Sequence, residues 1–164
     1  MTQIKICGIT NAEDALAAEA FGADAVGFVF AENSPRYIEP EAAAAISVLL
    51  KTVRRVGVFV NRDAEEVKAI QKICRLDLLQ FHGDESPSYC RAFPSSILIK
   101  AVSGEQEAHP ALLQDYEVFA FLVDGRTRGL RGGTGKTADW SAAREIGRRF
   151  RLILAGGLHP GNIE

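Results

Sequence analysis

Short apolar runs recur along the whole chain and are separated by longer amphipathic segments. The runs are rich in Val, Ile and Phe, and each spans only four to six residues, which is typical of strands rather than helices. They cover residues 4–7, 25–30, 55–60, 78–81, 97–102, 119–124 and 151–156. Because they are nearly continuous in hydrophobicity, we predict seven strands that are buried on both faces.

The segments between the strands carry signals for the start of helices. A capping residue precedes four of these stretches: Asn11, Asp63, Ser86 with Pro87, and Asp139. Alternation of strands and helices is typical of βαβ units around a parallel sheet. No linker or low-complexity segment interrupts this pattern, so we predict a single α/β domain over residues 1–164.

An open doubly wound sheet and a closed (β/α)8 barrel (TIM barrel) both fit this alternation. The polar residues favour the barrel. Lys5 and Cys7 share one face of the first strand, Gln80 and His82 lie at the end of the fourth, and Asp124 ends the sixth. Barrel enzymes collect their reactive groups at the carboxyl ends of several strands.

Composition narrows the range of partners. The 19 basic and 21 acidic residues are spread along the chain and give a net charge of −2, which argues against nucleic acid and anionic membranes as partners. Three cysteines without a C-x-x-C spacing argue against a structural zinc site and a disulfide framework, so we expect a cytoplasmic protein. The first strand begins by about Gln3, which leaves no room for a signal peptide, and no apolar run is long enough to span a membrane.

Two glycine-rich stretches are candidate phosphate sites because glycine lets backbone N–H groups close around an anion. Residues 129–137, GLRGGTGKT, do not form a P-loop, since Leu130 stands where that motif needs glycine. The stretch 155–164 follows the seventh strand, where barrels often bind phosphate. Either stretch alone is equally typical of a flexible turn. The candidates are Gly133, Gly135, Lys136, Gly156 and Gly157.

Six motifs in a fixed order carry a family resemblance. They are KICGIT at 5–10, VGFVF with RYI at 26–38, RVGVFV at 55–60, QFHGDE at 80–85, GGTGKT-x-DW at 132–140 and GGL at 156–158. With these motifs the chain closely resembles phosphoribosylanthranilate isomerase. The resemblance implies a (β/α)8 barrel without metal or cofactor. It also implies a phosphorylated sugar substrate and an Amadori rearrangement that converts an aminoaldose to an aminoketose in tryptophan biosynthesis.

The resemblance also implies roles for single residues. Cys7 would be the general base and Asp124 the general acid, and Lys5 beside Cys7 would favour the thiolate that a base must be. Arg36 would meet the anthranilate end of the substrate, with Gln80 and His82 near the site. Without the resemblance, a free cysteine is more often a packing residue, and an arginine after Ser-Pro is more often solvated.

Two other functions fit parts of the sequence. The related isomerase of histidine biosynthesis runs the same rearrangement with two aspartates, and Cys7 disfavours it because that enzyme has Asp at this strand end. The family resembled here continues after GGLxPxN with a seventh helix and an eighth strand, so we expect the eighth βα unit to be absent from this chain. An inactive barrel fragment, which binds phosphate sugars or needs a complementing segment, is therefore the alternative. The sequence predicts no oligomeric state.

Overall fold

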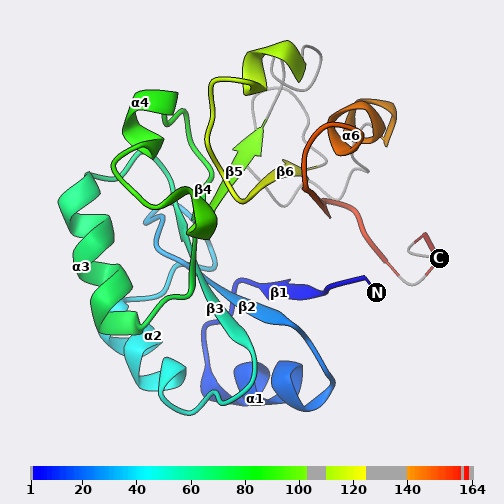
Figure 1. Ribbon diagram of the computed structural model, residues 1–164. Coiled ribbons are helices and arrows are strands. Elements are labelled where there is room, and N and C mark those ends of the chain that lie inside the picture. The colour runs from blue at the N-terminus through cyan, green and yellow to red at the C-terminus, as the bar shows by residue number, and fades with distance from the viewer. Residues whose placement is uncertain (1, 103–109, 125–139, 160, 163–164) are drawn as a thin grey trace. The chain divides into compact units, whose positions relative to one another are not determined.

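The computed structural model describes residues 2–102, 110–124, 140–159 and 161–162. The chain divides into two compact units, Met1–Glu85 and Ser86–Glu164. Strands and helices alternate along both units (Figure 1). All seven predicted strands are present, and their ends differ from the predicted ones by no more than one residue.

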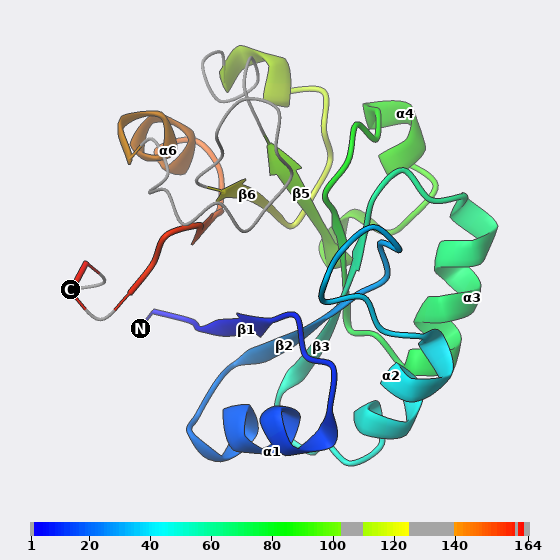
Figure 2. The same ribbon diagram turned by 180° about the vertical axis from the view of Figure 1, so that it is seen from behind.

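The first unit contains four strands and three helices. In chain order they are β1 (Lys5–Cys7), α1 (Ala12–Ala20), β2 (Ala25–Val29), α2 (Pro40–Ser47), β3 (Arg54–Phe59), α3 (Ala64–Cys74) and β4 (Leu78–Phe81). Each strand pairs in parallel with the next strand along the chain. Both views show α2 and α3 lying side by side (Figures 1 and 2), and the two helices are in contact.

The second unit is built in the same way. It contains α4 (Pro87–Cys90), the 3₁₀ helix η1 (Ser95–Ile97), β5 (Leu98–Val102), the 3₁₀ helix η2 (Pro110–Leu113), β6 (Ala120–Asp124), α6 (Trp140–Gly147) and β7 (Leu152–Ala155). Strands β5 and β6 pair in parallel, as do β6 and β7. Strand order therefore follows chain order within each unit. A doubly wound sheet instead reverses its order at a switch point, so this arrangement favours the barrel.

The predicted capping residues begin three helices. Asn11 Oδ1 accepts the N–H of Asp14 at 2.8 Å, and Asp63 Oδ1 accepts the N–H of Glu65 at 2.8 Å. Ser86 Oγ accepts the N–H of Tyr89 at 3.2 Å. Each bond satisfies an N–H group that the first helical turn leaves without a partner. The fourth predicted cap, Asp139, lies outside the described residues.

Aromatic side chains fill the core of each unit. In the first, Phe59 stacks on Phe30 with ring centroids 5.2 Å apart and meets the edge of Phe81. In the second, Phe121 contacts Phe150 at 5.0 Å in an edge-to-face arrangement. The described residues contain no helix that is long and apolar enough to cross a membrane.

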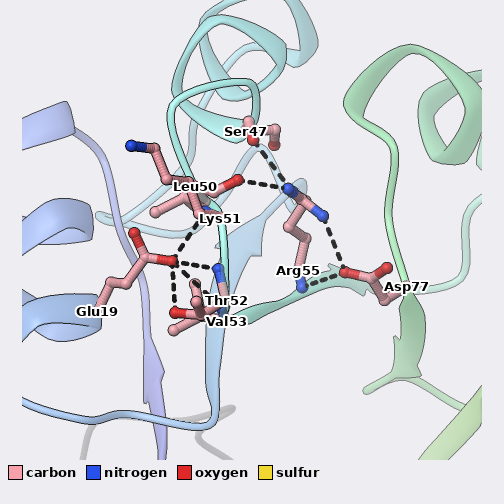
Figure 3. A network of polar contacts seen from close by, with 8 residues as sticks. All are labelled: Glu19, Ser47, Leu50, Lys51, Thr52, Val53, Arg55 and Asp77. Carbon is pink, nitrogen blue, oxygen red and sulfur yellow. Dashed lines mark hydrogen bonds and ion pairs between the residues drawn. The ribbon is translucent and has the colours of Figure 1, made fainter.

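A network of charged side chains fixes the loops at the amino ends of the strands in the first unit (Figure 3). Glu19, near the end of α1, accepts hydrogen bonds from the segment that leads into β3. Arg55 donates to the carbonyls of Ser47 and Leu50 at the end of α2 and pairs with Asp77 before β4. Both side chains thus satisfy backbone groups that the strands and helices leave unpaired.

Candidate active site

Cys7 and Lys5 lie on the same face of β1, as their spacing of two residues predicts. Strand register places Cys7 beside Gly27 of β2, and Gly27 beside Val56 of β3. On the same face, Gln80 of β4 pairs with Val58 of β3. One face of this sheet therefore carries Lys5, Cys7 and Gln80 together.

Lys5 and Gln80 make direct contact although two strands separate them. The Nζ atom of Lys5 donates to Oε1 of Gln80 at 2.5 Å and lies 3.6 Å from Sγ of Cys7. In a flat sheet, β1 and β4 would lie about 14 Å apart, three interstrand steps of about 4.8 Å. The contact is possible because the sheet curls, and it identifies this face as the concave one.

His82 extends the polar contacts beyond the end of β4. Its Nδ1 atom lies 2.7 Å from Nε2 of Gln80. Its backbone N–H donates to the carbonyl of Phe59 at 2.8 Å, which continues the ladder between β3 and β4 by one residue. His82 therefore lies beside Gln80, whose side chain also contacts Lys5.

Arg36 reaches the same end of β1 from the loop after β2. Its Nη1 atom donates to the carbonyl oxygen of Cys7 at 3.2 Å. The side chain runs over Gly8, where an added Cβ would lie 2.5 Å from Cδ of Arg36. Gly8 also has a φ of +91°, a conformation that other residues rarely adopt. Arg36 is otherwise exposed, so its guanidinium remains available to a ligand.

The structure adds Gly27 to the residues that shape this site. A Cβ atom at this position would lie 2.8 Å from Sγ of Cys7, closer than any real contact of that kind. The missing side chain of Gly27 therefore provides the space that the thiol occupies. A glycine inside a strand is a known signal of close approach, and this signal could have identified Gly27 from the sequence.

Asn61 and Glu85 were also missed by the sequence analysis. Glu85 is buried, and its Oε1 atom accepts the N–H of Asn61 at 2.8 Å while Oε2 accepts that of Gly83 at 3.0 Å. Asn61 in turn accepts the N–H of Asp84 at 2.7 Å. These bonds tie the loop after β3 to the loop after β4, directly beyond His82.

Asp124 is the last residue of β6 in the second unit. It pairs in register with Ala155, the last residue of β7, so Gly156 and Gly157 directly follow its neighbour. Both glycines have positive φ values, +81° and +64°. Asn162 Nδ2 donates to the carbonyl of Gly157 at 2.9 Å. Gly133, Gly135 and Lys136, the other phosphate candidates, lie outside the described residues.

The three thiols differ in their surroundings. Cys7 is partly exposed, whereas Cys74 and Cys90 are buried in helices. Cys74 donates to the carbonyl of Pro40 at 3.2 Å, and burial raises the pKa of its thiol to about 11. Cys74 is therefore protonated at neutral pH and cannot serve as a base. Cys7 is the one cysteine of the described residues that is open to a ligand.

Comparison with known proteins decides the family. Residues 4–164 match the family model described as N-(5'-phosphoribosyl)anthranilate (PRA) isomerase. The chain belongs to this family. It is 53% identical to the PRA isomerase of Syntrophus aciditrophicus over 99% of its own length and 71% of that protein. The family that the sequence motifs predicted is confirmed.

Crystal structures of PRA isomerases match the fold. One from Thermus thermophilus has a TM-score of 0.87 and 42% identity, over 99% of this chain and 80% of that one. Another, solved in complex with reduced 1-(o-carboxyphenylamino)-1-deoxyribulose 5-phosphate, has a TM-score of 0.81 and 43% identity, over 99% of this chain and 79% of that one. The fold of the chain is thus that of the (β/α)8 barrel, and the prediction of this class over the doubly wound sheet is confirmed.

Proposed function

We propose that this PRA isomerase converts N-(5'-phosphoribosyl)anthranilate to 1-(2-carboxyphenylamino)-1-deoxyribulose 5-phosphate with Cys7 as general base and Asp124 as general acid. The chain is an aldose–ketose isomerase of tryptophan biosynthesis by its family. The contact that supports our assignment best is the 3.6 Å separation between Lys5 Nζ and Cys7 Sγ. We place the reaction in the cytoplasm.

The rearrangement moves two protons and needs no external oxidant or reductant. The acid first protonates the furanose ring oxygen, the ring opens, and the anilino nitrogen forms a Schiff base with C1. The base then removes the proton from C2, which gives an enolamine. Tautomerisation of the enolamine yields the ketone at C2. An acid and a base on different strands can approach the sugar from two sides.

Cys7 suits the role of the base. A thiolate, and not a thiol, accepts the proton from C2, and an ammonium group next to the sulfur can pair with its charge. Lys5 supplies this ammonium group, and Gly27 leaves space around the sulfur. The partial exposure of Cys7 allows a substrate carbon to reach it.

Asp124 is assigned as the acid. It stands at the carboxyl end of β6, where barrel enzymes hold reactive groups. Asp124 is partly buried, and the two residues before it in β6, Leu122 and Val123, are buried. To act as the acid, Asp124 must hold a proton when the substrate is bound.

The remaining candidates would bind the two ends of the substrate. Arg36 can pair with the anthranilate carboxylate or stack on its ring, because a guanidinium does both. Gly156 and Gly157 at the end of β7 would offer backbone N–H groups to the phosphate. A related enzyme with a bound reduced form of the product supports a phosphorylated aminosugar as the ligand.

The assignment is tested by two substitutions, Cys7→Ser and Asp124→Asn, in the 164-residue chain. Each is expected to lower kcat by roughly 100-fold or more, because general acid or base catalysis contributes about that much. Turnover is followed by the decay of substrate fluorescence, and binding of the reduced product analogue is followed by calorimetry. Analogue binding is expected to stay within a few fold.

Asp115→Asn serves as the control, since Asp115 is exposed in the same unit. It should leave kcat and analogue binding unchanged. Near-normal turnover of either active-site variant would refute its assignment. A chain that binds the analogue without any turnover before substitution would instead favour the inactive barrel fragment.

A further inference from the structure

A chain of three contacts runs from the thiol to the imidazole in the first unit. Cys7 Sγ lies 3.6 Å from Lys5 Nζ, Lys5 Nζ lies 2.5 Å from Gln80 Oε1, and Gln80 Nε2 lies 2.7 Å from His82 Nδ1. Gln80 is in the middle and is only 2% exposed. Its buried amide therefore makes both contacts within the protein.

We propose that Gln80 is a positioning residue that sets the direction of hydrogen bonding along this chain. It holds the Lys5 ammonium beside Cys7, and it keeps His82 neutral with its proton on Nε2. The part that concerns Lys5 and Cys7 rests on the proposed function. The part that concerns the His82 tautomer does not.

The direction follows from the donors and acceptors of each group. An ammonium has three donors and no acceptor, so the amide atom that faces Lys5 must be the carbonyl oxygen. A reversed amide would bring an NH₂ group to 2.5 Å from an NH₃⁺ group, with no acceptor between them. The amide nitrogen of Gln80 must consequently face His82.

The tautomer of His82 follows in turn. Gln80 Nε2 has only donors, so Nδ1 of His82 must accept and must carry a lone pair. The ring proton is then on Nε2. Protonation of Nδ1 would set one N–H against another at 2.7 Å and would break this contact. At Nε2, His82 is thus a hydrogen-bond donor and not a proton acceptor, which separates it from the general base.

The neighbouring backbone holds His82 in place for this contact. Its N–H donates to Phe59, and the buried Glu85 binds the next residue, Gly83, through both carboxylate oxygens. The imidazole is therefore attached to a fixed segment of chain, and the amide of Gln80 is the part that selects its proton position. The Lys5 ammonium contacts both Gln80 and Cys7, so the amide of Gln80 also restricts the position of this ammonium group.

Long-range ¹H–¹⁵N NMR of the protein labelled at histidine measures the tautomer directly. The chain has three histidines, and His82→Asn identifies the signals of His82. In the unsubstituted chain at neutral pH, we expect Nδ1 to be unprotonated and Nε2 to be protonated. A proton on Nδ1 would overturn the proposal, whatever the activity of the chain.

Two substitutions then separate the two contacts of Gln80. Gln80→Glu keeps an acceptor toward Lys5 but replaces the donor toward His82, so it should move the ring proton to Nδ1 or add one there. Gln80→Met removes both contacts and should leave no preferred tautomer. An unchanged tautomer in Gln80→Glu would contradict the proposal.

The rate at which iodoacetamide alkylates Cys7 reports whether the Lys5 ammonium is held beside the sulfur. We expect Gln80→Met to slow alkylation roughly tenfold, because the thiolate is the nucleophile and loses its fixed positive neighbour. Gln80→Glu should alkylate at nearly the original rate. Equal rates in the unsubstituted chain and Gln80→Met would overturn the part that concerns Lys5. If Cys7→Ser retained turnover while the tautomer shifted as expected, the proposed function alone would fail.

Discussion

Gly27 lies beside Cys7 on the neighbouring strand, and a methyl group at position 27 would stand 2.8 Å from the sulfur. The thiol thus occupies the space of a missing side chain. The position of the proposed base therefore depends on Gly27, a residue that has no reactive side chain. A larger residue at position 27 of β2 would push the thiol away from the Lys5 ammonium, and glycine does not.

Gly27→Ala is expected to displace the thiol from Lys5. Overpacking of this kind costs about 1–3 kcal/mol in the free energy of unfolding. The rate of Cys7 alkylation and kcat should both fall, and thermal melting should show that the protein still folds. The matched control is Gly57→Ala on β3, where the added methyl would meet Leu76 and Phe59 instead. Equal alkylation rates in the two variants would contradict this relationship.

Gly8→Ala is expected to weaken substrate binding through Arg36. The added methyl would lie 2.5 Å from Cδ of Arg36 and would push the guanidinium away from the carbonyl of Cys7. We expect KM to rise and binding of the product analogue to weaken. Because φ is +91°, the variant should also lose about 1–2 kcal/mol of stability.

Gly22→Ala separates these two effects. Gly22 has a similar φ of +85°, but an added Cβ would meet no atom within 4 Å. It should lose a comparable amount of stability and keep the original KM. If both variants raised KM equally, strain and not Arg36 would be responsible.

Glu19→Gln is expected to make the stability of the fold less dependent on pH in the acid range. The N–H groups of Thr52 and Lys51, in that order of importance, lower the pKa of Glu19 from about 4.5 to about 2. The charged carboxylate therefore stabilises the fold above about pH 4.5, and this contribution is lost as the pH falls toward 2. The variant should melt at a lower temperature at pH 7, and the difference should shrink at pH 3.

The control for Glu19 is Glu13→Gln, an exposed carboxylate on the same helix. Its melting temperature should follow that of the unsubstituted chain at both pH values. A constant difference between Glu19→Gln and the unsubstituted chain from pH 7 to pH 3 would show that charge is not the cause.

Arg55→Lys is expected to destabilise the first unit although the charge is kept. The guanidinium donates to Ser47 at 3.1 Å and to Leu50 at 2.7 Å, and it also pairs with Asp77 at 3.4 Å (Figure 3). A lysine cannot make these contacts together, because it lacks the planar fork of donors. We expect a loss of about 1–3 kcal/mol in chemical denaturation.

Arg54→Lys is the comparison for Arg55. The neighbouring guanidinium donates to Gln3 at 3.2 Å, an exposed contact. This change should cost less than about 0.5 kcal/mol, as is usual for surface substitutions. Equal losses would mean that the bonds of Arg55 to the end of α2 contribute little.

The sequence by itself determined the strands, three of the helix starts and the residues at the strand ends. These features are local, because the spacing of apolar residues and the capping residues each involve only a few neighbouring positions. The ends of the strands were therefore predicted to within one residue. Alternation along a strand was enough to place Lys5 and Cys7 on one face. The motifs in order were enough for the family, which their similarity to known PRA isomerases confirmed.

Only the tertiary structure decided which of these groups meet. Lys5 and Gln80 are 75 positions apart and touch because the sheet curls across two intervening strands. The space for Cys7 beside Gly27 and the path of Arg36 over Gly8 depend in the same way on strand register and backbone twist. Such contacts arise from the packing of distant segments, and no local pattern of hydrophobic and polar residues specifies them.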